Sequence, residues 1–247
     1  MLIEQDQTIF AIPKKPMRKP YRPAPFIVEF TGVAGVGKTV LARKVNELLS
    51  QHSNPPKVVS KHDRLTVIKA LLSPRAIFHT IVGLTVLIKA GPGSPGRFGR
   101  QANKWVRIQY KLWGCGLVSA VHLLDHGFFQ TLRGIGGSKT RDIRWIGERL
   151  FAHITRPDLV VVLVSDAETI SLRRRGRGKI LSVLDPAGPK NAVSRMPEFT
   201  RLVEAMAARH GTMVLSLYNG PNDDLGRMAE TIFHKILEMT NRASDAQ

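Results

Sequence analysis

Cysteine is almost absent from this sequence, since Cys115 is the one cysteine among 247 residues. A single thiol excludes an internal disulfide and any zinc site built from several thiolates, and it fits a reducing cytoplasm. A long hydrophobic run is also lacking, because the longest nearly apolar stretch, Ala76 to Ile88, is interrupted by His79 and Thr80. That stretch is shorter than the roughly 20 residues of a membrane-spanning helix, although it can still lie against a membrane or fill a core.

Acidic residues are scarce relative to basic ones: 19 Asp and Glu stand against 37 Lys and Arg, for a formal net charge of +18. Such an excess favours phosphates, nucleic acid or anionic lipid as partners without choosing among them. The first residues include Glu4 and Asp6 and lack a basic start followed by an apolar stretch, so we expect no secretory signal. The expected location is the cytoplasm, with a peripheral position at the inner face of a membrane left open.

Much of the positive charge lies near the N-terminus. Residues 13–25 contain five prolines and several basic residues, a composition that neither buries a core nor continues a helix. We therefore expect residues 1–24 to form a flexible basic arm. This arm is either a solvated tail or an electrostatic tether to an anionic surface.

Beyond the arm, short β-rich apolar runs alternate with stretches long enough for crossover helices. The runs are residues 26–30, 58–59, 121–124, 159–164 and 213–217. This alternation predicts an α/β domain over residues 25–247, with a mostly parallel sheet covered by helices on both faces. Helices are also expected between Leu65 and Gly116, joined by a mobile basic loop at the glycine and proline cluster of residues 91–96.

The first apolar run leads directly into a glycine-rich turn that satisfies the pattern G-x-x-x-x-G-K-[ST] at every defined position. The turn consists of Gly32, Val33, Ala34, Gly35, Val36, Gly37, Lys38 and Thr39. Glycines let several backbone N–H groups point at one anion, and the helix that follows adds its positive dipole end. Lys38 then reaches the β- and γ-phosphates of ATP, and the Thr39 hydroxyl is placed to bind Mg²⁺. The predicted fold is therefore the three-layer P-loop NTPase fold.

The rest of the chain narrows the class of P-loop protein. An Asn-Lys-x-Asp segment for reading guanine and the recurrent motor motifs of helicases are both missing, which disfavours GTPases and helicases. The informative stretch opens with Pro157-Asp158-Leu159, continues as an apolar strand and an acidic turn, and ends in an arginine-rich segment. Here the sequence resembles the thymidylate kinase branch of the nucleoside monophosphate kinase-like P-loop kinases. The likeness runs discontinuously over about residues 26–239, and the middle third matches poorly.

The resemblance implies roles for particular residues. Arg173 and Arg177 take the positions of lid arginines, which stabilise the charge of the transferred phosphoryl group. Asp125 takes the position of the aspartate in the family's Asp-Arg-Tyr or Asp-Arg-Phe signature, near the acceptor and Mg²⁺. Asp125 also follows directly after the run 121–124, at the carboxyl end of a predicted parallel strand. The carboxyl ends of parallel strands face the binding crevice in folds of this kind. The alternatives are a helix cap for Asp125 and a solvated basic helix end for the arginines.

This chain departs from the family pattern at two places. His126, Gly127 and Phe128 follow Asp125 where the family has an arginine and an aromatic residue, and residues 61–64 read Lys-His-Asp-Arg where an arginine, a glutamate and a proline are usual. We therefore do not expect dTMP to be a good acceptor. Asp63 and Arg64 are as well suited to holding an acceptor as to being ordinary loop charges. The histidines His62, His122 and His126 are interpreted as structural.

The leading hypothesis is a kinase that transfers the γ-phosphoryl group of ATP to a small acceptor, such as a nucleotide or a sugar or lipid precursor. Lys38, Asp125, Arg173 and Arg177 carry the chemistry, and Thr39 and Asp125 hold Mg²⁺. The alternative is a P-loop ATPase or a nucleotide-binding regulatory protein associated with a polyanion or a membrane surface. The oligomeric state is left open.

Overall fold

The structure is a computed structural model that describes residues 25–52, 58–59, 73–91, 94–136, 140–175 and 187–245. The predicted basic arm, residues 1–24, lies outside the described residues, as do residues 61–64.

A five-stranded sheet with the order β2-β3-β1-β4-β5 forms the centre of the molecule, and each of these neighbouring pairs is parallel. The strands are β1 (Phe26–Gly32), β2 (Val58–Val59), β3 (Val121–Leu124), β4 (Leu159–Val164) and β5 (Met213–Tyr218). The central strand β1 is buried along its whole length. Its mostly apolar sequence, without a regular alternation of apolar and polar residues, is typical of a strand covered on both faces.

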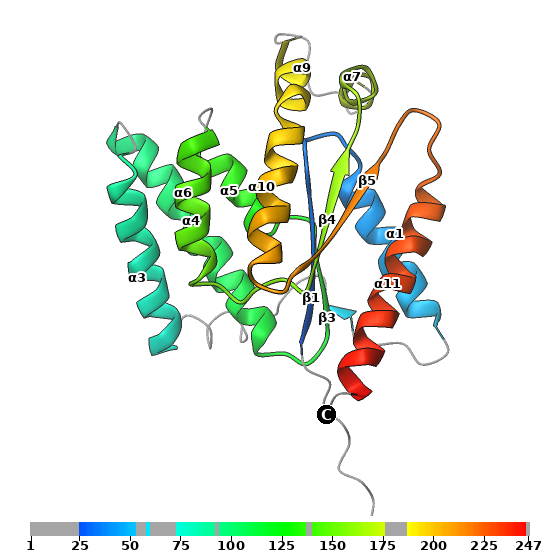
Figure 1. The fold of residues 1–247 in the computed structure, drawn as a ribbon, viewed down its shortest axis with the longest axis horizontal. Helices are drawn as coiled ribbons and strands as arrows, with labels where there is room; N and C mark the ends of the chain where they lie inside the picture. The colour runs from blue at the N-terminus through cyan, green and yellow to red at the C-terminus, as the bar shows by residue number, and fades with distance from the viewer. Residues whose placement is uncertain are drawn as a thin grey trace, which may run out of the picture.

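Helices cover both faces of this sheet (Figure 1). Helices α1 (Lys38–Gln51) and α11 (Leu225–Asp245) lie on one face. The other face carries α3 (Pro74–Lys89), α4 (Pro95–Gly116), α5 (Phe128–Gly136), α6 (Thr140–Phe151) and α10 (Met196–Ala208). Helices α7 (Ala167–Arg175) and α9 (Ala187–Ser194) lie beyond the carboxyl ends of the strands. This is the predicted three-layer α/β P-loop fold, with all five predicted strand positions confirmed.

The middle of the chain differs from the prediction in one detail. Helix α4 begins at Pro95, inside the glycine and proline cluster that was expected to be a loop. The Ser94 side chain accepts a hydrogen bond from the Arg97 backbone N–H at 3.3 Å, and proline suits the first helical position because it has no N–H to satisfy. Among the described residues, no helix combines the length and apolar character needed to cross a membrane.

The amino ends of the strands are joined by Asp158, from the Pro-Asp-Leu stretch noted in the sequence. Its Oδ2 atom accepts a hydrogen bond from the Ile27 backbone N–H at 2.7 Å, and its carbonyl accepts one from the Met213 N–H at 2.9 Å. Burial raises the pKa of Asp158 to about 6, although the Ile27 bond lowers it. This aspartate thus aligns β1, β4 and β5 at the edge away from the glycine loop.

Candidate functional site

The glycine-rich turn links the end of β1 to the start of α1. Its backbone has positive φ angles at Gly32, Gly35 and Gly37, of 144°, 93° and 103°. A Cβ atom at Gly32 would lie 2.3 Å from the Leu163 carbonyl oxygen of the neighbouring strand, so only glycine fits there. The sequence therefore supplies glycine where the loop has to curl tightly against β4.

Lys38 turns back over the beginning of this loop. Its Nζ atom donates to the carbonyl oxygens of Gly32 and Val33, each at 2.9 Å, and the residue is 8% exposed. The ammonium group is thus held at the start of the turn by the carbonyls of Gly32 and Val33, and the N-terminal N–H groups of α1 also attract anions. A phosphate group is the ligand that suits this arrangement.

The two residues predicted to bind a metal lie beside each other. Thr39 Oγ1, in the first turn of α1, is 3.3 Å from Asp125 Oδ2, which follows the carboxyl end of β3. A hydroxyl and a carboxylate oxygen are hard ligands of the kind that Mg²⁺ accepts together with phosphate oxygens and water. The described residues contain no cluster of three or more His, Cys, Asp or Glu side chains that could hold a metal without a ligand's help.

Glu29 connects this region to α5 from inside the sheet. Its carboxylate accepts hydrogen bonds from the backbone N–H groups of Phe128 at 2.8 Å and Gln130 at 3.1 Å, which are free donors of the first helical turn. Burial raises the pKa of Glu29 to about 7 in spite of these bonds. Asp125 is thereby fixed in the short connection between β3 and α5, since α5 is bound to β1 through Glu29.

Gln130 brings the start of α5 to the glycine loop itself. Its Oε1 atom accepts hydrogen bonds from the Gly32 N–H at 3.3 Å and the Thr31 hydroxyl at 3.5 Å. One face of α5 therefore lies along the end of β1, next to the phosphate loop.

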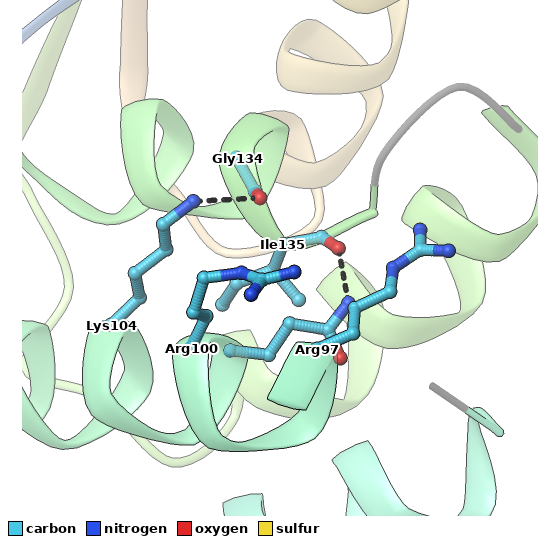
Figure 2. Close-up of a pocket in the computed structure, with 6 residues that line it drawn as sticks. Arg97, Arg100, Lys104, Gly134 and Ile135 are labelled. Atoms are coloured by element: carbon cyan, nitrogen blue, oxygen red, sulfur yellow. Dashed lines mark hydrogen bonds between the residues drawn. The ribbon is translucent and has the colours of Figure 1, made fainter. Parts of the chain in front are cut away.

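The other end of α5 is held by α4, as Figure 2 shows. Lys104 Nζ donates to the Gly134 carbonyl at 2.9 Å, and Gln101 Nε2 donates to the Ile135 carbonyl at 2.7 Å. Cationic and amide donors satisfy the carbonyl groups that a helix leaves free at its C-terminus. With Arg97 and Arg100 these residues line a basic pocket of about 170 Å³.

Asp166 lies between β4 and α7 and caps the first turn of the helix, which begins at Ala167. The Asp166 carboxylate accepts bonds from the Thr169 N–H at 2.7 Å and the Thr169 hydroxyl at 2.6 Å, and these bonds lower its pKa to about 2. These bonds from Thr169 make Asp166 the N-terminal cap of α7, and the arginine-rich C-terminal end of this helix lies at the glycine loop. There Arg174 Nε donates to the Ala34 carbonyl at 3.0 Å.

The neighbouring Arg173 points to the loop between β5 and α11. Its guanidinium donates to Asn219 Oδ1 at 3.1 Å and to the Gly220 carbonyl at 2.8 Å. The buried Asn219 in turn donates from Nδ2 to the Val36 carbonyl of the phosphate loop at 2.7 Å. Arg173 thus reaches the phosphate loop through Asn219, whereas Arg174 contacts it directly.

The structure therefore brings together Lys38, Thr39, Asp125 and the end of α7, whereas Arg177, Asp63, Arg64 and His62 lie outside the described residues. His122 is buried in β3, with Nε2 2.8 Å from the Val118 carbonyl oxygen, which fits its structural interpretation. His126 is exposed, and its carbonyl accepts a hydrogen bond from Lys111.

Several residues at the site were not predicted from the sequence. Glu29 is a single polar residue inside an apolar run, and such a residue is a sign that the buried group has a specific partner. Gln130 and Asn219 belong to ordinary helical and loop sequence. Arg174 is one of three consecutive arginines, residues 173–175, and their positions in the sequence do not identify the one that contacts the loop.

No protein-family model matches the chain, and no curated protein matches it. Among solved structures, the chain is similar to a deoxyadenosine kinase from M. mycoides, solved with bound dCTP, at 11% sequence identity and a TM-score of 0.47. The likeness covers 86% of this chain and 100% of that one.

Proposed function

We propose that this chain is an ATP-dependent phosphotransferase that moves the γ-phosphoryl group of ATP to a small acceptor. The observation that carries the proposal is the approach of Asp125 to within 3.3 Å of Thr39 beside an intact phosphate loop. A loop that only bound a nucleotide would need the glycines and Lys38. A carboxylate at the end of the neighbouring strand adds a group for Mg²⁺ and for the acceptor.

In this proposal the backbone N–H groups of residues 32–39 surround the phosphates of ATP, and Lys38 exchanges its carbonyl partners for phosphate oxygens. Thr39 and Asp125 would hold Mg²⁺, which neutralises charge on the β- and γ-phosphates when it is bound. Asp125 also faces the acceptor from the end of β3. Positioning and charge stabilisation supply most of the catalysis in such a reaction.

The arginine-rich end of α7 supplies positive charge above the loop. Following the resemblance to thymidylate kinase-like enzymes, Arg173 and Arg177 belong to the lid that covers the transferred group. The contact between Arg174 and the Ala34 carbonyl adds Arg174 to this set. A lid of this kind excludes water and so favours transfer over hydrolysis.

The acceptor is small, and we propose that dTMP is a poor one. The residue two positions after Asp125, where the family has an aromatic side chain, is Gly127 in this chain. A Cβ atom at Gly127 would lie 2.2 Å from Glu29 Cδ, so this position cannot carry a side chain while Glu29 caps α5. The acceptor surface next to Asp125 therefore differs from that of a standard thymidylate kinase.

A second candidate, an ATPase or regulatory protein at a polyanion or membrane surface, is favoured by one feature of α3. Ile77, Phe78, Ile81 and Ile88 are exposed on this outer helix of a chain with a net charge of +18. An exposed apolar stripe on a strongly basic protein suits an anionic lipid surface. Association of this kind is also compatible with a kinase that works beside a membrane in the cytoplasm.

An acceptor screen tests the proposal. Purified protein, ATP and Mg²⁺ are incubated with dTMP, other nucleoside monophosphates, and sugar and lipid precursors, and ADP formation is compared with the hydrolysis background. The proposal predicts that one acceptor class raises ADP formation with little dependence on salt. Stimulation by polyanions alone, falling steeply as salt rises, would favour the second candidate.

A further inference from the structure

A larger pocket lies at the amino ends of the strands, at the edge of the sheet opposite to α7 and α9 (Figure 1). Its volume is about 530 Å³, and its lining comes from Pro25 before β1, the start of α3, the end of α4 and residues 152–156 after α6. This volume is in the range of pockets that hold small organic ligands. Strand β1 has 7 residues, so the pocket is about 20 Å from the glycine loop at the other end of that strand. A ligand here would occupy a site separate from that of the nucleotide.

The charged side chains that line this pocket are all basic. Arg75 comes from α3, and Arg156 comes from the segment that follows α6. None of the described lining residues is an aspartate or a glutamate, and within the described ranges neither arginine forms an ion pair. A concave site lined by charge of one sign concentrates the field of that charge. The pocket therefore attracts anions.

Arg75 is held beside an aromatic ring of the same pocket. Its guanidinium carbon lies over the Trp113 ring, 5.8 Å from the ring centroid. A guanidinium stacked in this way keeps the N–H groups at its edge for a ligand. The planar fork of these N–H groups matches two oxygens of a phosphate group.

Two histidines add an uncharged hydrogen-bond donor to the lining. His79 Nδ1 and His153 Nδ1 are 2.9 Å apart, so one ring donates a hydrogen bond to the other. Burial lowers the pKa of both rings, and the positive charge of Arg75 lowers that of His79 further, so both are neutral at pH 7. The neutral ring that accepts the bond at Nδ1 carries its hydrogen on Nε2. Neither Nε2 atom has a hydrogen-bond partner among the described residues, and one Nε2–H is therefore left for a ligand.

The rest of the lining is largely apolar. Leu117, which is 51% exposed, and Ile154 line the pocket together with Pro25 and Trp113. An inorganic anion would leave this apolar surface in contact with water, whereas an apolar ligand group would bury it, at about 25 cal/mol for each Å². The lining thus suits a ligand in which an anionic group is attached to an apolar body.

We propose that this pocket binds an organic phosphate, with the phosphate group on Arg75 and Arg156 and the apolar body against Trp113 and Leu117. The histidine pair donates one further hydrogen bond to the phosphate. A phosphate monoester carries a charge of about −1.5 to −2 at pH 7, which two guanidinium groups balance, whereas a carboxylate would leave one of them unbalanced. The site is independent of phosphoryl transfer, because it lies at the other edge of the sheet.

The test is isothermal titration at 0.15 M salt with three probes: 1-naphthyl phosphate, inorganic phosphate and the neutral 1-naphthol. We expect 1-naphthyl phosphate to bind about tenfold or more tightly than either of the other two, because it alone has both parts of the ligand. Arg75→Met and Arg156→Met should each weaken its binding about tenfold. The matched control is Arg107→Met, which removes an exposed arginine of α4 that does not line the pocket and should change the affinity less than about twofold.

Hydrogen–deuterium exchange with the same probe locates the site. Binding in the pocket should slow exchange in residues 73–79 and 152–156, whereas binding at the phosphate loop would slow it in residues 32–39. Protection confined to the phosphate loop would overturn the proposal, and so would equal affinities in Arg75→Met, Arg156→Met and Arg107→Met. Inorganic phosphate that bound as tightly as 1-naphthyl phosphate would contradict the role of the apolar lining and thus the class of ligand.

Discussion

The carboxylate of Glu29 occupies the space into which a side chain at Gly127 would project. A Cβ atom at Gly127 would lie 2.2 Å from Glu29 Cδ and 2.4 Å from Oε2. The same carboxylate caps the first turn of α5. Gly127 and Glu29 thus belong to one arrangement, because the carboxylate of Glu29 needs a glycine at position 127. This arrangement sets the position of Asp125 relative to the phosphate loop.

Gly127→Ala should destabilise the protein by about 1–3 kcal/mol, because the added methyl group has to displace a buried carboxylate from its cap. The control is Gly99→Ala on α4, where a Cβ atom meets nothing within 4 Å. Alanine in that exposed helical position should stabilise the protein by about 0.5–1 kcal/mol. Urea unfolding of both variants measures the difference, and equal stabilities would contradict the packing of Glu29 against Gly127.

The raised pKa of Glu29 predicts a pH dependence of stability. In the unfolded chain Glu29 loses its proton near the ordinary value of 4.5, whereas in the folded protein it keeps the proton up to about 7. The unfolded state therefore binds fewer protons in this window, and Glu29 makes the free energy of unfolding fall as pH rises through it, by about 3 kcal/mol at most. Between pH 5 and 8 the parent should lose more stability than Glu29→Gln. Asp158, whose pKa is also raised, contributes to both proteins and cancels in the comparison. Parallel pH profiles would contradict a protonated Glu29.

Asn219 links three parts of the site, since it donates to the Val36 carbonyl and accepts from Arg173. Asn219→Ala should cost about 1–3 kcal/mol of stability, because it leaves the Val36 carbonyl without its donor and removes one of the acceptors of Arg173. We expect the affinity for ATP to fall about tenfold as the phosphate loop loosens, which corresponds to about 1.4 kcal/mol. Isothermal titration of ATP measures this effect, with the exposed Asn222→Ala as the control. An unchanged affinity would show that the loop holds its shape without Asn219.

The sequence was sufficient for the fold and for the phosphate loop, because both depend on local patterns. Apolar runs without alternation marked the buried strands, and the glycines fell where positive φ angles are needed. The start of α4 was placed wrongly because glycine and proline suggested a loop, whereas the Ser94 side chain caps a helix with proline at its first position.

The partners of the side chains at the site could not be predicted, because they come from contacts between distant segments. Glu29 and Phe128 are 99 positions apart, and Arg174 and Ala34 are 140 apart. The resemblance selected Arg173 from the arginine row by position. Which arginine lies over the loop depends on the direction that the Asp166 cap gives to α7, and this is a property of the folded chain.

The two neighbouring arginines should differ when they are replaced. Arg174→Ala should lower kcat about tenfold or more with a small effect on ATP affinity, because its contact lies above the loop and the loop remains whole. Arg173→Ala should also lower kcat, as expected of a lid residue, and in addition should lower stability by about 1–3 kcal/mol through the lost bonds to Asn219 and Gly220. Kinetics and unfolding on both variants separate these effects. An unchanged kcat in Arg173→Ala would contradict a place for Arg173 in the lid.

The most direct measurement of the central claim follows the γ-phosphoryl group of labelled ATP into either the acceptor or water. Phosphoryl transfer predicts one labelled acceptor for each ADP formed in the presence of the best acceptor from the screen, with little label in inorganic phosphate. Lys38→Ala should reduce this transfer about a hundredfold or more, because the variant lacks the positive charge that stabilises the transferred phosphoryl group. Label that appears only as inorganic phosphate, at a rate that no acceptor changes, would contradict the account and identify the chain as an ATPase.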